Sequence, residues 1–280
     1  MVRIAALLCA LFVLFLAPRS AFSQGVPQGI NARLTFLEGL NLFYAGKYHR
    51  SEEEFSLVSG ALGTTNPMAI VALRLLYDRF FDKVSLQAPG ARERLLKETD
   101  LAINRYEDGS CDAENLKAIA GPGVDCAYVG AALYSFRSGL YAQDSSWHKA
   151  LDDRVRFLEC AKDSAVPQAV FLEGMAEYEV SLQSRWKRWG ARFAGVPSNE
   201  KHSLELVAQG LDGNASPFVD DIWFFIFDTE QNYLRQKKET GHHDGADERL
   251  LAAYSFEQVS GYLASKYPEN PRLKKLISFH

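Results

Sequence analysis

The sequence has little of what marks a non-globular chain. It contains only 20 glycines and 10 prolines in 280 residues, with 47% hydrophobic and 24% charged residues, which excludes a collagen-like or intrinsically disordered protein. It also lacks an excess of positive charge, since the formal net charge is −4 and the pI is about 5.9. Nucleic-acid-binding proteins usually carry a basic surface, so we expect no nucleic-acid partner.

The local motifs of common catalytic and metal sites are also missing. There is no GxSxG elbow, no HExxH pair, no phosphate-binding GxxxxGKS/T loop and no EF-hand loop. Of the six histidines, only His242 and His243 form a cluster, together with Asp244 on a glycine-flanked loop. They would chelate a divalent ion only if a third ligand came from elsewhere, and a solvated loop is the simpler interpretation. We predict no catalytic residue, no metal and no cofactor.

Residues 1–23 have the pattern of a secretory signal peptide. Arg3 is followed by an unbroken apolar stretch, Ile4–Ala17, and the segment ends in an Ala-x-Ser sequence at Ser23. A positive start, an apolar centre and small residues before the cleavage site are the three parts of such a signal. We expect cleavage between Ser23 and Gln24, which leaves a mature chain of residues 24–280 that is periplasmic or extracellular.

Two alternatives to cleavage are weaker. An N-terminal membrane anchor needs roughly 20 apolar residues to cross a bilayer, and the apolar stretch is shorter than that. Attachment as a lipoprotein at Cys9 would call for a small residue just before it, where Leu8 stands. No later segment is apolar enough to span a membrane, so the sequence predicts an exported protein without a transmembrane helix.

Three cysteines remain after cleavage, in a compartment that oxidises thiols. Cys111 and Cys126 bracket the sequence Gly121-Pro122-Gly123, which can turn the chain back and bring the two sulfurs together. A disulfide between Cys111 and Cys126 is therefore the preferred interpretation, with Cys160 a buried thiol in a helix. The alternative is three inert thiols. Metal binding is disfavoured because no CxxC or matched histidine pair accompanies them.

From about residue 30 onward the apolar spacing is helical. Ala252, Phe256, Val259 and Leu263, for example, follow one another at intervals of four, three and four residues, as on one stripe of an α-helix. The six apolar residues 222–227 would also suit a buried strand. We favour a helix that is packed on all sides, so the fold class predicted is all-α.

Glycines recur at the same place in a repeating pattern. The tetrapeptide Phe36–Gly39 returns as Phe171–Gly174, and Gly130 lies 44 residues before Gly174. Because a glycine inside a helix costs about 1 kcal/mol relative to alanine, its recurrence suggests that a neighbouring helix packs tightly over it. A period near 45 residues is typical of stacked helical hairpins.

The segment Gly39–Val58 carries a resemblance to a known family. A small residue at Gly39, a turn at Gly46, a small Ser51 and a bulky Phe55 resemble a tetratricopeptide repeat (TPR). The chain is similar to exported bacterial envelope TPR-like proteins of unassigned role. The resemblance implies a right-handed superhelix, or α-solenoid, of about five degenerate TPR-like hairpins, although the spacing exceeds the 34 residues of the standard repeat.

The pattern predicts ten main helices and one insertion. The insertion covers about residues 107–125, contains both candidate disulfide cysteines and includes a short helix at Glu114–Ile119. The main helices are expected at about 31–45, 48–60, 67–84, 90–106, 127–142, 145–163, 167–189, 199–210, 217–237 and 246–266.

Residues 185–193 are an anomaly in an acidic protein. Four bases are interleaved there with three aromatic residues. The bases are Arg185, Lys187, Arg188 and Arg192, and the aromatic residues are Trp186, Trp189 and Phe193. Such a segment suits a peripheral contact with anionic lipid, an acidic partner or a glycan. The simpler expectation is that the aromatic rings plug the next hairpin while the bases reach water. Arg185, Trp186, Arg188 and Trp189 are candidate partner-binding residues.

A second set of candidate contact residues lies on the helix predicted at 127–142. Tyr134, Tyr141 and Trp147, with Arg137 between them, are spaced as on one helix face and could line a concave groove. Aromatic residues at helical spacing are more often core. Arg137 and Tyr141 complete the candidate partner-binding residues.

We predict an exported, non-catalytic protein-binding or scaffold module that holds a protein or peptide in a helical-repeat groove. One alternative is a solute- or lipid-binding accessory protein of an envelope transport system. Another is an enzyme whose site uses distant carboxylates such as Asp152, Asp153, Asp220 and Asp221, although these equally serve as a solvated helix face and a helix start.

Overall fold

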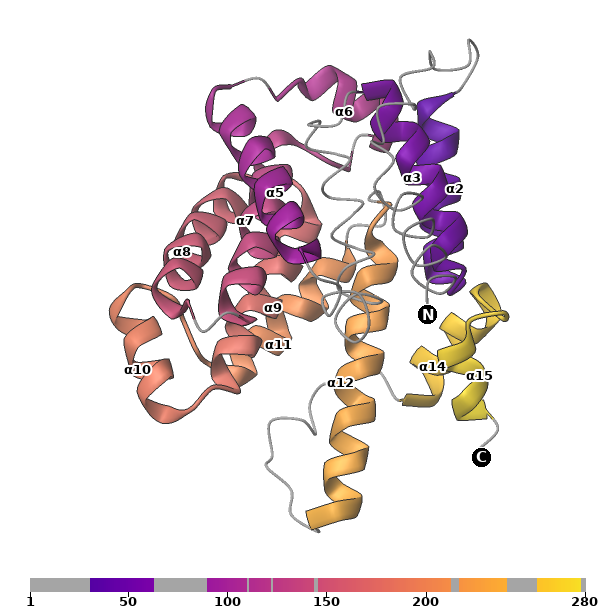
Figure 1. The fold of residues 1–280 in the computed structure, drawn as a ribbon. Helices are drawn as coiled ribbons and strands as arrows, with labels where there is room; N and C mark the ends of the chain where they lie inside the picture. The colour runs from indigo at the N-terminus through magenta and orange to yellow at the C-terminus, as the bar shows by residue number, and fades with distance from the viewer. Residues whose placement is uncertain are drawn as a thin grey trace, which may run out of the picture. The chain divides into compact units, whose positions relative to one another are not determined.

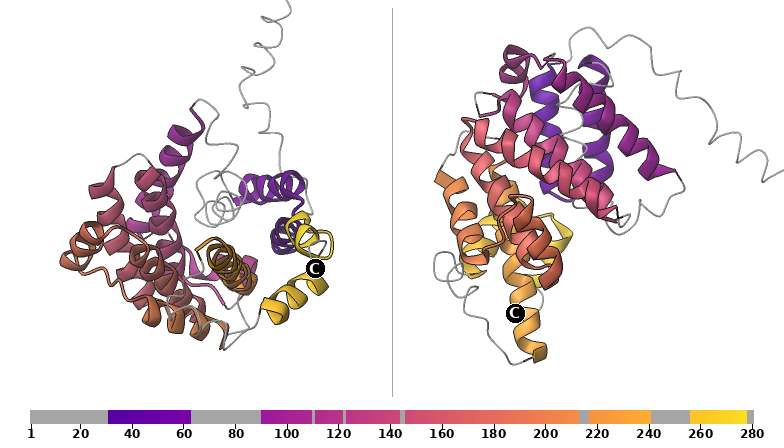
Figure 2. Two further views of the ribbon diagram at one scale, coloured as in Figure 1. Left: turned by 90° about the horizontal axis from the view of Figure 1, so that it is seen from below. Right: turned by 90° about the vertical axis from the view of Figure 1, so that its left-hand side faces the viewer.

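A computed structural model describes residues 31–62, 90–109, 111–121, 123–143, 146–212, 217–240 and 256–277. Within these residues every regular element is a helix, so the predicted all-α class is confirmed (Figures 1 and 2). The helices are α2 (Ala32–Tyr44), α3 (Tyr48–Leu62), α5 (Ala91–Glu107), α6 (Ala113–Ala120), α7 (Cys126–Gln143), α8 (Trp147–Asp163), α9 (Pro167–Ser181), α10 (Arg185–Phe193), α11 (Glu200–Gln209), the 3-10 helix η3 (Gly210–Asp212), α12 (Val219–Thr240), α14 (Phe256–Lys266) and α15 (Pro271–Ile277).

Several predictions fall outside the described residues. These are the signal peptide at 1–23, the helix at 67–84, the His242–Asp244 cluster and the first part of the helix at 246–266. The other expected helices match the observed ones within a few residues, apart from one. The apolar run at 222–227 lies inside α12 and is helical, as favoured over a strand.

The single helix expected over 167–189 is wrong. Helix α9 ends at Ser181 and α10 begins at Arg185, and the backbone of Ser184 is extended between them, with a ψ of 152°. The apolar spacing concealed this break, because Leu182, Trp186 and Trp189 stay four and three residues apart across it. The helical spacing of apolar residues therefore continues through residues 182–184, although the helical hydrogen bonding is interrupted there.

Two pairs of helices, α2 with α3 and α9 with α11, pack closely where one helix has a glycine. In α2, a Cβ added to Gly39 would lie 2.7 Å from the ring of Phe55 on α3. Ser51 Oγ also donates to the carbonyl oxygen of Gly39 at 2.7 Å. In α9, a Cβ added to Gly174 would lie 2.6 Å from the carbonyl oxygen of Ser203 on α11. The predicted role of the recurring glycines is thus confirmed in these two pairs.

Helix α12 joins the first pair to the last helices. Phe224 on α12 stacks on Tyr44 of α2 at 5.7 Å between ring centres, and Tyr44 is also 5.5 Å from Tyr267. The amide of Asn270 donates to the carbonyl oxygen of Tyr44 at 2.7 Å, across 226 residues of sequence. Repeats of an open solenoid contact only their neighbours, so this contact between the first and last helices is additional to simple stacking.

Candidate docking surface

Helix α10 is a nine-residue connection between α9 and α11 with a well-defined end. Gly195 adopts a left-handed φ of 82°, and the amide of Val196 donates back to the carbonyl oxygen of Ala191 at 2.9 Å. Gly195 also donates to Arg192 at 3.0 Å, which completes the Schellman pattern that glycine favours at a helix C-terminus. Ala191 and Val196 are fully buried, so this end fixes α10 to the protein.

Side chains of the basic residues help to hold α10 in place. Arg192 Nε donates to Ser198 Oγ at 2.7 Å, and the Lys187 ammonium lies 5.2 Å from the centre of the Trp147 ring on α8. A cation over an aromatic face is attracted by the negative face of the ring. Lys187 is accordingly half-buried, whereas Arg185 and Arg192 are exposed.

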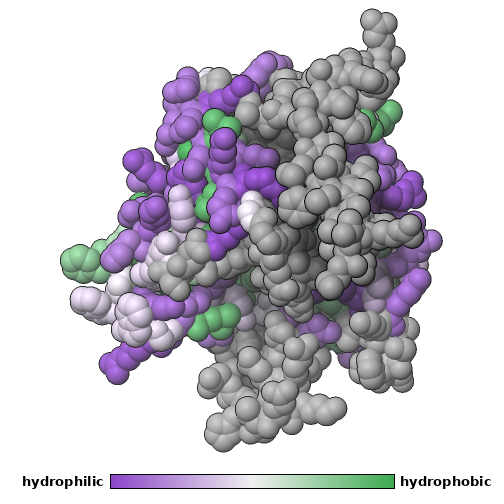
Figure 3. All heavy atoms as spheres, viewed as in Figure 1, coloured by the Kyte–Doolittle hydropathy of each residue, from purple (hydrophilic) through white to green (hydrophobic). Residues whose placement is uncertain are grey.

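The opposite face of α10 is apolar and open to solvent. Trp186, Trp189 and Phe193 of α10 are 66%, 71% and 86% exposed, and Leu182, which directly follows α9, is 62% exposed. The three rings follow one another at intervals of three and four residues within α10, which aligns them on one face of the helix. The rings of Trp189 and Phe193 stack at 5.9 Å. In Figure 3, pale and green side chains stand out on the left of the view, where Figure 1 labels α10.

This arrangement overturns the expectation that the aromatic rings plug the next hairpin. Periodicity predicts correctly that Trp186, Trp189 and Phe193 share a face, but it does not say whether that face meets the core. The small residue Ala191 faces the protein instead, and the rings point away from it. A partner for residues 185–193 stays a prediction.

The charge around this face is of one sign. Between Glu179 and Glu200 the sequence contains four bases and no acid. Glu179 is itself paired with Arg154 on α8, at 2.7 Å. Arg185, Arg188 and Arg192 are spaced by three and four residues and therefore share one flank of the helix. We call the exposed side chains of Leu182, Trp186, Trp189 and Phe193, with the bases Arg185, Lys187, Arg188 and Arg192, the α10 face.

Arg137, the candidate contact residue on α7, forms its hydrogen bonds within the fold. It donates to Asp153 on α8 at 2.7 and 2.8 Å and to Asp100 on α5 at 2.7 Å. Its side chain is 18% exposed. Burial alone would lower the pKa of Arg137, but the two carboxylates outweigh it and raise that pKa. Arg137 clamps α5, α7 and α8 together and leaves little surface for a partner.

The aromatic stripe around Arg137 is divided between core and rim. Tyr134 is buried, and its hydroxyl donates to Glu107 at 2.6 Å. Tyr141 is half-buried between two cations, with Arg137 6.0 Å and Lys149 5.2 Å from its ring centre. The interpretation of Tyr134 as core is thus correct, and the groove predicted along this stripe is not supported.

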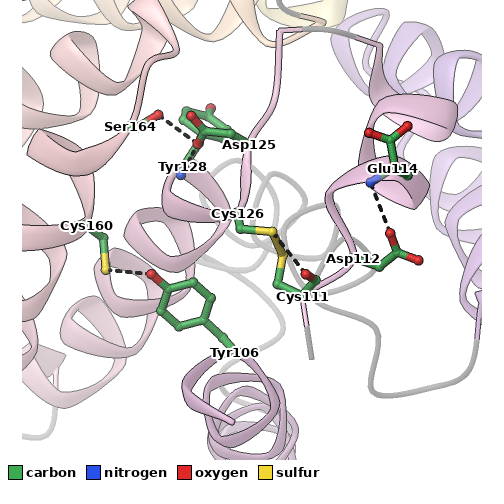
Figure 4. Close-up of a disulfide and its surroundings, with 9 residues drawn as sticks. All are labelled: Tyr106, Cys111, Asp112, Glu114, Asp125, Cys126, Tyr128, Cys160 and Ser164. Carbon is green, nitrogen blue, oxygen red and sulfur yellow. Dashed lines mark hydrogen bonds between the residues drawn. A yellow bond between two sulfur atoms is a disulfide. The ribbon is translucent and has the colours of Figure 1, made fainter. Parts of the chain in front are cut away.

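The structure joins Cys111 to Cys126 through a disulfide, which is the pairing that the sequence favours (Figure 4). The bond ties the connection before α6 to the first residue of α7. Cys160 on α8 is the one free cysteine of the described residues, and its Sγ lies 3.4 Å from the hydroxyl of Tyr106. Burial, above all, raises the pKa of the Cys160 thiol, so the thiolate is disfavoured there.

Three of the four carboxylates of the enzyme alternative hold helices together, whereas Asp152 is exposed on α8. Asp220 on α12 accepts from Lys266 Nζ and from the Tyr267 hydroxyl, both at 2.6 Å. Asp221 accepts from the Tyr44 hydroxyl at 3.2 Å, and Asp153 is paired with Arg137 as described. The partners of Asp220 lie 46 and 47 residues away in sequence. The spacing of residues near Asp220 could therefore not predict these contacts.

Glu230 is a buried carboxylate that the sequence reasoning missed. Glu230 on α12 is 2% exposed, and neither of its carboxylate oxygens has a hydrogen-bond partner among the residues that the structure describes. Burial, and then the charge of Glu257 on α14, raise the pKa of Glu230 from 4.5 to about 7. Its position in α12 gave only a weak signal, since it lies three residues after the buried Phe227, where the apolar run of the helix has ended.

The described residues contain no cluster of three or more histidine, cysteine, aspartate and glutamate side chains that could hold a metal ion. Among the same residues, no helix has both the length and the apolarity needed to cross a bilayer. Comparisons with models of protein families, with curated proteins and with solved structures return no match to this chain.

Proposed function

We propose that this chain is an exported, non-catalytic binding module that attaches to a component of the cell envelope through the α10 face. The exposed aromatic residues of that face carry the proposal. Three large aromatic rings in solvent cost free energy unless another surface covers them for part of the time. Elsewhere in the described residues, the aromatic residues of α2, α7 and α12 are mostly core.

The rest of the fold would serve as a rigid support. The α2/α3 and α9/α11 pairs pack through glycine, and the Arg137 clamp fixes α7 against α5 and α8. These features support a stack of TPR-like hairpins, arranged as a right-handed superhelix of about five, which remains part of the proposal. Such a stack must also allow the hydrogen bond between Asn270 and Tyr44, which joins the last helices to the first pair.

Export also belongs to the proposal. The disulfide between Cys111 and Cys126 is compatible with an oxidising compartment, and the signal peptide predicted at residues 1–23 would deliver the chain there. A protein or peptide held by the helical stack is the partner that the TPR resemblance implies.

In-cell cross-linking of the tagged mature protein, followed by mass spectrometry of the captured envelope species, tests the proposal. The decisive comparison is a variant in which Arg185, Lys187, Arg188 and Arg192 are changed to serine. A control variant changes two bases far from α10 in sequence, Arg94 and Arg105, to serine. We expect capture to fall only in the first variant. Equal capture by wild type and both variants would refute a role for the α10 face.

A further inference from the structure

The geometry of α10 suits a contact with an extended, flat surface. Ala191 lies about 170° around the helix from the mean direction of Trp186, Trp189 and Phe193, at 100° per residue. Because Ala191 is the buried residue, the three rings project outward as ridges. A partner that receives them must be soft enough to admit whole rings, or must offer a matching cavity for each.

The charge pattern narrows the chemistry of that surface. The chain as a whole is net negative, so an anionic surface repels most of it and attracts the one segment that has four bases and no acid. This complementarity both selects an anionic partner and orients the protein, with α10 foremost.

We propose that α10 docks on a bilayer rich in anionic phospholipid, with the aromatic rings in the boundary between headgroups and acyl chains and the bases on the phosphates. This inference rests on the proposed function and names the surface that the α10 face meets. Trp and Phe on one face with Arg and Lys beside them is the composition of helices that lie in the bilayer interface. A bilayer admits protruding rings without a preformed cavity.

The size of the effect follows from the exposed bases. A base close to an anionic membrane contributes a factor of about 5 to binding. The exposed pair Arg185 and Arg192 therefore contributes about 30-fold. Added salt should weaken binding as well, because the Debye length falls from about 10 Å at 0.1 M to about 3 Å at 1 M.

The experiment uses the full mature chain and vesicles of phosphatidylcholine with or without roughly 30% phosphatidylglycerol, an anionic lipid. Binding is measured by vesicle flotation. The charge variant changes Arg185 and Arg192 to serine, and its matched control changes Arg156 and Lys201, also exposed bases, to serine.

A second pair of variants tests the rings without changing the charge. Trp189 and Phe193 are changed to alanine in the test variant, and the exposed Leu34 and Leu101 in its control. Thermal unfolding of each variant checks that the fold is intact. In addition, lipids brominated on the acyl chain should quench tryptophan fluorescence in the wild type on binding.

We expect binding to phosphatidylglycerol vesicles only, a loss of about 30-fold in the charge variant, a loss of at least 10-fold in the ring variant and near-normal binding in both controls. Equal weakening in variants and controls would overturn the inference, as would binding to neutral vesicles alone. If the protein binds no vesicle but the α10 variants still fail to capture an envelope protein in the cross-linking assay, the lipid inference is wrong and the proposed binding module stands. If α10 matters in neither assay, both proposals fall.

Discussion

Changing Gly174 to alanine should destabilise the protein, although alanine is the better helix former. Gly174 lies inside α9, and an added Cβ would come within 2.6 Å of the Ser203 carbonyl oxygen and 2.8 Å of the Val207 amide nitrogen. Both are backbone atoms of α11, so no side-chain rotation relieves the clash. Overpacking of this kind costs about 1–3 kcal/mol, occasionally more.

The helix propensity of alanine offsets about 1 kcal/mol of that cost. Because the obstructing atoms are backbone, we take the upper end of the range and expect a net loss of about 2 kcal/mol. For a chain of this size the melting temperature should fall by about 4–8 °C.

Gly261 provides the matched control for this prediction. It lies on the exposed side of α14, and an added Cβ would meet no atom within 4 Å. Gly261→Ala should therefore gain only the helix propensity, about 1 kcal/mol of stability. Urea unfolding of both variants beside the wild type measures the difference. Equal stability of Gly174→Ala and Gly261→Ala would refute the close packing of α9 against α11.

Three further predictions concern the interior. Cys126→Ser should lose about 3 kcal/mol, the chain-entropy value for a loop of about 15 residues, and treatment of the wild type with reductant should lower its urea midpoint to that of the variant. Arg137→Ala should lose about 3 kcal/mol because Asp153 is left buried without its partner, and adding Asp153→Asn in a double-mutant cycle should recover part of that loss. Glu230→Gln should stabilise the protein by up to about 3 kcal/mol at pH 8 and have no effect at pH 4. The folded-state pKa of about 7 lies above the ordinary 4.5, so wild-type stability falls as the pH rises between these values; a pH-independent effect of the variant would contradict the burial of Glu230.

Local contacts were readable from the sequence, because their signals are short. Gly39 and Ser51 lie 12 residues apart and meet in one hairpin, as their small size indicates. The Cys111 and Cys126 pair closes a short loop around a glycine-rich turn, which limited the choice of partner. In both cases a turn between the two residues, which is itself visible in the sequence, brings them together.

Long-range contacts were not readable, because nothing local marks them. Arg137 was visible as a charged residue on an aromatic stripe, but its partner Asp100 lies 37 residues away on another helix. The bond from Asn270 to Tyr44 spans 226 residues. Periodicity assigned a face to each helix and could not say what that face would meet.

The same limit explains the error at α10. Trp186, Trp189 and Phe193 have the spacing of a core stripe, and large aromatic residues usually bury. Their direction was decided by Ala191 and Val196, two small residues whose burial fixes the other side of the helix. The clue available beforehand was the charge, since four bases without an acid are an unusual flank for a core helix.

The most direct test of the central claim is photo-cross-linking in cells from a residue of the α10 face. A photoreactive amino acid replaces Phe193, the most exposed ring of that face, and a second strain carries it at the exposed Leu101 of α5. We expect strong cross-links to an envelope lipid or protein from position 193 and few from position 101. Equal cross-linking from the two positions, or none from position 193, would contradict the assignment of α10 as the binding surface.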